Sequence, residues 1–294
     1  MKLAWLASAH ICGPRDWLKE MLVAAGWQMI VRRASARVVT LCYHSVSAHS
    51  FAVTTPLDFE QHLGWLRAHC AVVPFSRVMD EARAQRRDRP VVAVTFDDGH
   101  ADNYECAFPL LQRYGVPATF FLTTGLLDRD PRVMQRFQTL FRARAEGIRP
   151  LAWAQVQEMR RAGMEFGAHT HSHPDLSRLT RDAVEIELTR SKGILEERLG
   201  ERISSMAYPF GVPRRHFSAE TMRIAAAVGY DRAAAITFRG VRRSHSQWAI
   251  PRFPVPRGGV GTLQDIVFGA WDLFGVWQEW APVALQRRRW DRYD

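Results

Sequence analysis

The segment "PVVAVTFDDGH", residues 90–100, decides the fold and raises the functional question. Its first half is an uninterrupted apolar run rich in valine, which is typical of a β-strand buried on both faces of a parallel sheet. The run ends in two adjacent carboxylates, Asp97 and Asp98. Burying charged groups without partners is costly, so a buried strand that ends in two of them predicts a site that uses them.

Strands and helices alternate on both sides of this segment. Further strands are predicted at 36–46, 117–124, 164–169, 203–211, 233–237 and 250–257, and helices at 55–69, 102–113, 149–163, 179–200 and 218–230. This alternation indicates βα units on a parallel sheet. No GxGxxG motif follows the first strand, which argues against a dinucleotide-binding sheet and leaves a closed barrel as the favoured architecture. Residues 125–148 are expected to be a loop or a helical insertion.

The predicted strands end in polar or aromatic side chains. In α/β barrels the carboxyl ends of the strands converge on one face, and the catalytic groups lie there. The residues at these ends are His44, Asp97 with Asp98, His169, and Tyr208 with Pro209 and Phe210. We therefore expect them to gather around one site.

The segment "HTHSHPD", residues 169–175, places histidines directly after a predicted strand. If it turns helically, His169 and His173 lie one turn apart on one side and His171 points away. If it stays extended, all of them share a face. Two imidazoles and one carboxylate form a common ligand set for a catalytic Zn²⁺ or a similar divalent cation.

The adjacent aspartates can divide this chemistry between them. Successive residues that leave a strand point in different directions, so one carboxylate can bind a cation while the other accepts a proton from water. Each feature alone has a simpler interpretation: the aspartates could cap the helix at 102–113, and the histidines could form a surface cluster. Their joint occurrence at strand ends favours the metal site.

At these residues the sequence resembles the polysaccharide deacetylases, also known as the NodB-homology family or carbohydrate esterase family 4. "TFDDG" (95–99) and "HTHSHPDL" (169–176) are similar to the first two motifs of that family. The resemblance covers about residues 36–257. It implies a distorted (β/α)₇ barrel that uses a divalent cation to remove acetyl groups from N-acetylated sugars.

The resemblance also implies individual roles. It implies that Asp97 is the catalytic base and that the metal ligands are Asp98, His169 and His173. Thr170 and Ser172 correspond to supporting residues. Zn²⁺ is the favoured cation, with Co²⁺ and Ni²⁺ as alternatives.

The third motif of the family is matched more loosely, by "AYPFG" at 207–211. The resemblance implies that Tyr208, Pro209 and Phe210 form one wall of the substrate groove and that the backbone N–H of Tyr208 stabilises an oxyanion. The arginine that often precedes this motif is missing, and Met206 and Ala207 stand in its place.

The late Leu-x-His motif that usually supplies the general acid is absent after residue 211. "LCYHSV" at 41–46 looks instead like the Tyr-His stretch in the permuted branch of the family, which includes the poly-N-acetylglucosamine deacetylases. On that analogy His44 protonates the leaving amine. The alternative is a strand-end histidine with an ordinary hydrogen-bond partner.

The composition bears on the expected binding partners and on the cellular compartment. The formal net charge is +10, and almost all of the positive charge is arginine, since the lysines are confined to Lys2, Lys19 and Lys192. The chain has no basic block with interleaved aromatic residues, so we expect no nucleic-acid partner. The four cysteines show no CxxC or metal-finger spacing, which favours a reducing compartment over an oxidised, secreted scaffold.

The two ends of the chain leave the location open. Residues 1–13 imitate a signal peptide, but "PRDWLKE" follows them in place of a small-residue cleavage site. Residues 15–34 have the spacing of an amphipathic helix with a basic end, which could contact a membrane surface or cover the domain. Residues 266–280, "IVFGAWDLFGVWQEW", could likewise cover the barrel or meet a membrane. We expect a cytoplasmic protein, or one peripheral at the inner membrane, rather than a secreted one.

We therefore expect an N-terminal helical extension at 1–35, a catalytic α/β barrel at 36–257 and a C-terminal helical segment at 258–294. The expected activity is metal-dependent removal of the N-acetyl group from a sugar in a polysaccharide or glycan. One alternative is deacetylation or deformylation of a small lipid-linked sugar. The other is a barrel that binds carbohydrate without catalysis.

Overall fold

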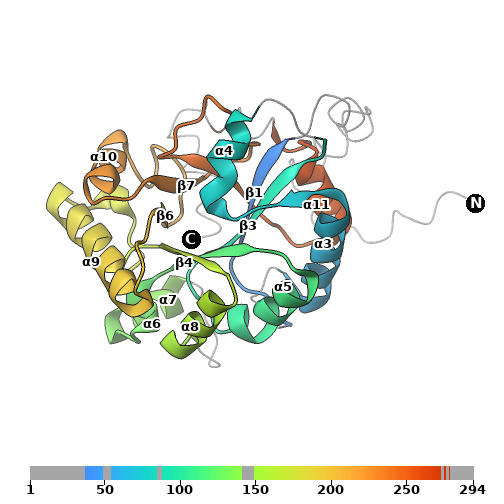
Figure 1. The fold of residues 1–294 in the computed structure, drawn as a ribbon. Coiled ribbons are helices and arrows are strands. Elements are labelled where there is room, and N and C mark those ends of the chain that lie inside the picture. Colours follow the sequence, from blue (N-terminus) through green and yellow to red (C-terminus); the bar gives the residue numbers. More distant parts are fainter. Residues whose placement is uncertain are drawn as a thin grey trace, which may run out of the picture.

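The structure of the chain is a computed structural model that describes residues 37–48, 54–84, 88–140 and 149–272, together with Gly275 and Gln278. The predicted N-terminal helix and most of the C-terminal segment beyond residue 272 lie outside the described residues. Within the described ranges, parallel strands form a barrel with helices packed around it (Figure 1).

Seven parallel strands close the barrel, which confirms the predicted (β/α)₇ architecture. In order around the ring they are β1 (Val38–Tyr43), β3 (Val91–Phe96), β4 (Ala118–Leu122), β5 (Glu165–Ala168), β6 (Ser205–Ala207), β7 (Arg232–Ile236) and β8 (Ile250–Pro254). β1 pairs with β3 on one side and with β8 on the other, and these two pairings close the ring. The two-residue strand β2 (Ala71–Val72), which was not predicted, pairs with the beginning of β3 outside the ring.

The strand alternation separates the inside of the barrel from the outside. A single buried cluster draws residues from β1, β3, β4, β6, β7 and β8, so it must fill the interior; Val91 and Ala93 are its members from β3. Val92, Val94 and Phe96 belong instead to the larger cluster shared with the surrounding helices. Because side chains alternate along a strand, Thr95 points inward, and Asp97 follows on the inward side.

Two short elements close the amino-terminal end of the barrel. The 3-10 helix η1 (Phe75–Arg77) and helix α4 (Val78–Arg83) contribute Phe75, Val78 and Met79 to the interior cluster. Phe75 packs edge-on against Phe121 of β4, with ring centroids 5.2 Å apart. The amino-terminal end is therefore filled with apolar side chains, and the polar interior lies toward the carboxyl ends of the strands.

The predicted helices are present around the barrel. They are α3 (Pro56–His69), the π-helical turn η2 (Asn103–Ala107) with α5 (Phe108–Tyr114), α8 (Trp153–Arg161), α9 (Arg181–Leu199) and α10 (Ala219–Ala227). Their ends have local causes. The Thr55 side chain caps α3 by accepting from Asp58 N at 3.1 Å. Gly200, with a φ of 65°, ends α9 in the left-handed conformation that suits glycine.

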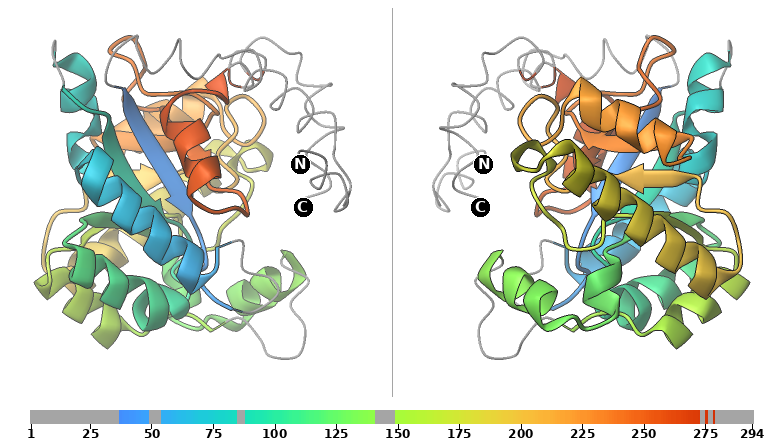
Figure 2. Two further views of the ribbon diagram at one scale, coloured as in Figure 1. Left: turned by 90° about the vertical axis from the view of Figure 1, so that its right-hand side faces the viewer. Right: turned by 90° about the vertical axis from the view of Figure 1, so that its left-hand side faces the viewer.

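The predicted insertion at 125–148 is helical where it is described. Helix α6 (Thr124–Leu127) and helix α7 (Pro131–Leu140) form its first part, and residues 141–148 lie outside the described ranges. Val133 and Phe137 of α7 pack on Leu126 of α6 as a small separate cluster. Figure 2 shows α7 standing out from the body of the barrel.

The described part of the C-terminal segment covers the barrel. Helix α11 (Val260–Val267) buries Leu263, Ile266 and Val267 and packs against α3. For the first residues of "IVFGAWDLFGVWQEW", the structure therefore favours the covering role. Among the described residues, no helix has the length and apolar character needed to span a membrane.

Candidate active site at the mouth of the barrel

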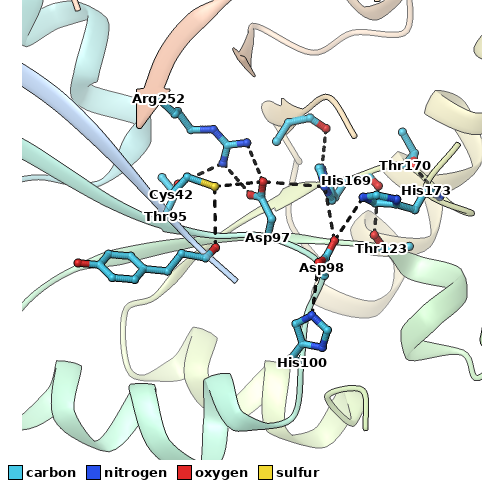
Figure 3. Close-up of polar contacts among 12 residues, drawn as sticks. Cys42, Thr95, Asp97, Asp98, His100, Thr123, His169, Thr170, His173 and Arg252 are labelled. Atoms are coloured by element: carbon cyan, nitrogen blue, oxygen red, sulfur yellow. Dashed lines mark hydrogen bonds and ion pairs between the residues drawn. The ribbon is translucent and has the colours of Figure 1, made fainter. Parts of the chain in front are cut away.

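The carboxyl ends of the strands bring the predicted site residues together. Asp98, His169 and His173 each offer one ligand atom, and these atoms lie within 4.8 Å of one another. Asp98 Oδ1 is 3.6 Å from His169 Nε2 and 3.5 Å from His173 Nε2 (Figure 3). All three side chains are buried, so the three-ligand cluster predicted from two distant motifs is present.

The backbone at this cluster is unusual. Asp98, Thr170 and His173 have φ values of 74°, 65° and 53°, in the left-handed region that residues other than glycine seldom occupy. Such conformations cost on the order of 1–3 kcal/mol each and concentrate at functional sites. The segment from His169 to His173 is thus neither a helix nor a strand. Its irregular path points two imidazoles at Asp98.

Neighbouring side chains hold this loop in place. Thr170 Oγ1 accepts from His173 N at 3.0 Å. Glu187, on α9, accepts from His171 N and Ser172 N, both at 2.9 Å, and from Ser172 Oγ at 2.6 Å. Thr170 and Ser172 therefore support the loop as the resemblance implied. Glu187 was not predicted, because a polar residue on a helix gives no sign of which loop it contacts.

The third histidine turns away from the cluster. His171 Nδ1 lies 2.9 Å from Thr124 Oγ1 of α6. Of the two predicted arrangements, the structure has the one in which His171 points away from His169 and His173, although the segment is not helical.

A backbone carbonyl fixes the tautomer of His169. His169 Nδ1 is 2.8 Å from the carbonyl oxygen of Ala207. A carbonyl oxygen can only accept a hydrogen bond, so Nδ1 carries a proton and Nε2 is the nitrogen that faces Asp98. Burial lowers the pKa of His173 to about 3, and this keeps the second imidazole neutral at physiological pH. In both rings Nε2 is the nitrogen that faces Asp98.

The surroundings of the Asp98 carboxylate suit a bound cation. Both of its oxygens are buried, and neither has a hydrogen-bond partner in the described part of the chain. His100 Nε2 lies 3.3 Å from Oδ2, a distance typical of an ion pair. A buried carboxylate normally satisfies its oxygens, so two imidazole nitrogens beside an unsatisfied carboxylate fit a divalent metal ion.

Asp97, the neighbouring carboxylate, is fully partnered. Arg252 of β8 donates to both of its oxygens, from Nη1 to Oδ1 at 2.6 Å and from Nη2 to Oδ2 at 2.7 Å. Cys42 Sγ donates to Oδ2 at 3.4 Å. Burial alone would raise the pKa of Asp97, but the Arg252 guanidinium, together with His169 and His44, more than offsets it and holds the pKa below its usual range. Asp97 is therefore an ionised carboxylate.

Arg252 was not predicted from the sequence. Its side chain is 0% exposed, lies over the ring of Phe121 and also donates to Thr95 Oγ1 at 3.1 Å. The third motif, which follows β6, lacks its usual arginine. A buried arginine is present instead on β8, two strands along the ring from β6. The sequence did contain a clue to its position. Arg252 lies in the short apolar strand at 250–254, and the alternation of side chains places it on the inward face with Ile250.

His44 lies beside Asp97. One of its ring nitrogens, Cys42 Sγ and an Asp97 oxygen lie within 4.8 Å of one another. Its backbone carbonyl accepts from Asn103 Nδ2 at 2.7 Å, which ties the residue to η2. His44 is less buried than Cys42 and Asp97, and desolvation by the surrounding protein lowers its pKa.

The wall formed by the third motif is only partly as predicted. Phe210 packs against the His173 ring, with centroids 4.9 Å apart. Tyr208 is buried and stacks on Phe217 at 3.8 Å. The backbone N–H of Tyr208, however, donates to the Ala234 carbonyl at 3.2 Å. The expectation that this N–H is available to an oxyanion is therefore not met in this structure, because the β6–β7 ladder uses it.

Comparison with known proteins shows which families and relatives this chain resembles. Residues 84–233 match the sequence profile of the family described as polysaccharide deacetylase. The chain is 25% identical over 238 residues to YxkH of Bacillus subtilis (strain 168), which is named for the same family; the match covers 80% of this chain and 76% of the relative. It is 24% identical over 165 residues to the poly-β-1,6-N-acetyl-D-glucosamine N-deacetylase of Staphylococcus aureus (strain MRSA252), covering 53% of this chain and 52% of that protein.

A solved structure shares the fold. The Streptococcus pyogenes deacetylase PplD, determined in complex with acetate, superposes with a TM-score of 0.67 at 23% identity, covering 80% of this chain and 99% of PplD. At this level of identity the likeness shows the fold alone.

Proposed function

The chain belongs to the polysaccharide deacetylase family, and from that premise we propose that the barrel mouth is the active site of a metal-dependent N-deacetylase acting on an N-acetylated sugar unit of a glycan. The carbohydrate deacetylases among its relatives hydrolyse N-acetyl amide bonds. The observation that carries the proposal is the contrast between the unsatisfied Asp98 carboxylate and the paired Asp97 carboxylate next to it.

Asp98, His169 and His173 would hold the cation, for which we favour Zn²⁺ over Co²⁺ or Ni²⁺. When bound, the cation supplies Lewis acidity toward the acetyl carbonyl and lowers the pKa of water. The protein fixes the ligands through the Ala207 carbonyl behind His169 and through the strained loop that aims His173. A site assembled in this way needs little rearrangement when the cation and substrate bind.

Asp97 is the group that removes the proton from the attacking water. It lies on the inward side of the barrel beside the ligand cluster, with Oδ2 3.9 Å from His169 Nε2. The bidentate contact with Arg252 orients the carboxylate and keeps it ionised. The same contact weakens it as a base, so its proton affinity is tuned by the arginine that holds it.

His44 is placed to donate a proton to the leaving nitrogen when its ring is charged, a form that burial disfavours and that the carboxylates of Asp98 and Asp97 favour. It lies beside Asp97 at the open end of the site, where a substrate can reach it. In the proposed reaction the oxygen of water bonds to the acetyl carbon and the C–N bond breaks. The water proton goes to Asp97 and the amine takes one from His44, so the products are acetate and the free amino sugar. General acid–base groups of this kind contribute about 10²–10⁴-fold to the rate.

The test is acetate release from N-acetylglucosamine oligosaccharides by the metal-stripped protein, before and after addition of one equivalent of Zn²⁺. We expect release only after reloading. His44→Ala should lose about 100-fold or more in kcat while still binding the metal. Arg223→Gln, on the exposed face of α10 away from the mouth, is the matched control. Wild-type turnover that is unchanged by metal removal would falsify the proposal.

A further inference from the structure

One buried group at the barrel mouth has no role in the reaction above. Cys42, at the end of β1, is 1% exposed, and its thiol donates to Asp97 Oδ2. Burial raises the pKa of this thiol well above its ordinary value. A buried, protonated thiol is a poor nucleophile, so covalent catalysis and redox sensing do not account for its position, whereas a bound cation would itself displace the thiol proton.

Cys42 nevertheless lies where a second cation could be held. Its sulfur, a ring nitrogen of His44 and an oxygen of Asp97 lie within 4.8 Å of one another. Zinc binds thiolate at about 2.3 Å and imidazole at about 2.0–2.1 Å, so ligand atoms around one ion are about 3.5–4 Å apart. His44 is the least buried of these side chains, so a change of its ring orientation is the adjustment that would bring the ligand atoms to these distances.

We propose that Cys42, His44 and Asp97 form a second, weaker cation site whose filling inhibits the enzyme, an inference that rests on the proposed function for the roles of Asp97 and His44. The ligand is a borderline or soft divalent cation such as Zn²⁺, Co²⁺ or Cd²⁺, because a thiolate selects against Mg²⁺ and Ca²⁺. On binding, the thiol proton is released to solvent and the sulfur becomes an anionic ligand.

The charges around the two clusters explain why the second site should be weaker. In the described part of the chain Asp98 faces imidazoles, whereas both oxygens of Asp97 already accept from the permanently charged Arg252 guanidinium. A second cation must therefore enter beside a fixed positive charge. The first ion should fill Asp98, His169 and His173, and the second site should fill only at excess metal.

Filling the second site removes the acid–base machinery. The cation would engage the Asp97 carboxylate that accepts the water proton and the His44 imidazole that protonates the amine. Turnover should therefore rise with the first equivalent of metal and fall as the second one binds.

Cobalt titration of the metal-stripped protein tests this directly, because a cobalt–thiolate bond gives a charge-transfer band in the near ultraviolet. We expect no such band with the first equivalent, a band with the second, and a loss of at least about 10-fold in acetate release as the band grows. Cys42→Ser should lose both the band and the inhibition. Cys106→Ser, which removes a thiol on η2, should keep both.

Three outcomes would overturn the inference: no band in the wild type, a band that persists in Cys42→Ser, or a band without loss of turnover. If Cys42→Ser does not fold, the wild type still decides, since excess Zn²⁺ should inhibit and the same excess of Mg²⁺ should not. Failure of the singly loaded enzyme to release acetate would instead count against the proposed function, while the band would still report on the site.

Discussion

Asp97 and Asp98 are neighbours in the chain, equally buried, and opposite in their surroundings. Asp97 leaves β3 on the inward side of the barrel and meets a guanidinium and a thiol. Asp98 turns through a left-handed backbone conformation and meets only imidazoles, with no hydrogen bond to either oxygen. The two carboxylates are one residue apart, and the left-handed φ of Asp98 turns it away from Arg252. The protein therefore neutralises the charge of Asp97, whereas the charge of Asp98 is placed to bind a cation.

The comparison also explains how the fold tolerates two adjacent buried carboxylates. Two carboxylates in one buried site would ordinarily raise the pKa of one of them. Here Arg252 neutralises Asp97, and the imidazoles of His100, His173 and His44 stabilise the charge of Asp98. The pKa of each is held below its ordinary range even though burial acts to raise both.

Asparagine substitutions should separate the two roles, and this is the largest effect we expect. Asp97→Asn should keep the metal and lose about 10²–10⁴-fold in kcat, because only the base is removed. Asp98→Asn should lose the metal itself, since a neutral amide replaces the anionic ligand. Metal content after dialysis and acetate release measure the two effects. Equal metal loss in both variants would contradict the division of labour.

Removing the cation that neutralises Asp97 should destabilise the fold. Arg252→Met leaves a buried carboxylate unpaired, which costs about 3–5 kcal/mol in the free energy of unfolding. Arg252→Met with Asp97→Asn should recover much of that loss, because no charge is then left without a partner. Urea denaturation measures both. Arg113→Gln, which breaks the exposed pair with Glu60, is the control and should cost under about 1 kcal/mol.

The same substitution should move the pH dependence of catalysis. Arg252 holds the pKa of Asp97 low, so its removal raises that pKa. A base must be ionised to act, and the acidic limb of the pH–rate profile should therefore shift to higher pH in Arg252→Met. A limb that stays in place would show that Arg252 does not tune the base.

Much of this site could be predicted from the sequence, because it lies at strand ends. The apolar run before Asp97 fixed a strand, and the same reasoning brought His44, His169 and Tyr208 to one face of a barrel. The assignment of Asp98 and His173 as metal ligands came from the resemblance to the family's first two motifs. What these residues share is that their position follows from the local pattern together with one rule about parallel strands.

The partners that tune the site could not be predicted in the same way. Arg252 and Glu187 act across the fold, one from inside β8 and the other from the side of α9. The sequence around Arg252 does not indicate that it contacts Asp97, and the sequence around Glu187 does not indicate that it contacts the histidine loop. The Tyr208 N–H was misassigned for the same reason, since its acceptor, Ala234, lies on the next strand of the ring.

His100 offers a way to sharpen the description of Asp98. Its Nε2 is the contact of Asp98 Oδ2, the oxygen that does not face the two ligand imidazoles. Side chains that orient a metal ligand are typically worth 10–100-fold in metal affinity. We expect His100→Phe to weaken Zn²⁺ binding by about that factor in a chelator competition, with unfolding in urea as a check that the fold persists. Unchanged affinity would show that the ligands orient Asp98 alone.

A third carboxylate tests the comparison at the other end of the barrel, with the smallest expected effect. Glu165 begins β5 and has neither an arginine bonded to it nor a ligand cluster; it accepts from Ser76 N at 3.2 Å and Thr119 Oγ1 at 3.1 Å. Burial raises its pKa, and these hydrogen bonds only partly offset that rise.

A carboxyl group whose pKa is raised by folding contributes stability at low pH that is lost as the pH rises through the folded-state pKa. Each tenfold gain in proton affinity corresponds to about 1.4 kcal/mol. Glu165→Gln should therefore flatten the decline in unfolding free energy above pH 4.5 and make the protein slightly more stable at pH 7, as measured by urea denaturation across that range. A loss of stability at pH 7 would mean that the ionised carboxylate is held as firmly there as Asp97 is by Arg252, and that burial without a cation is not what distinguishes Glu165.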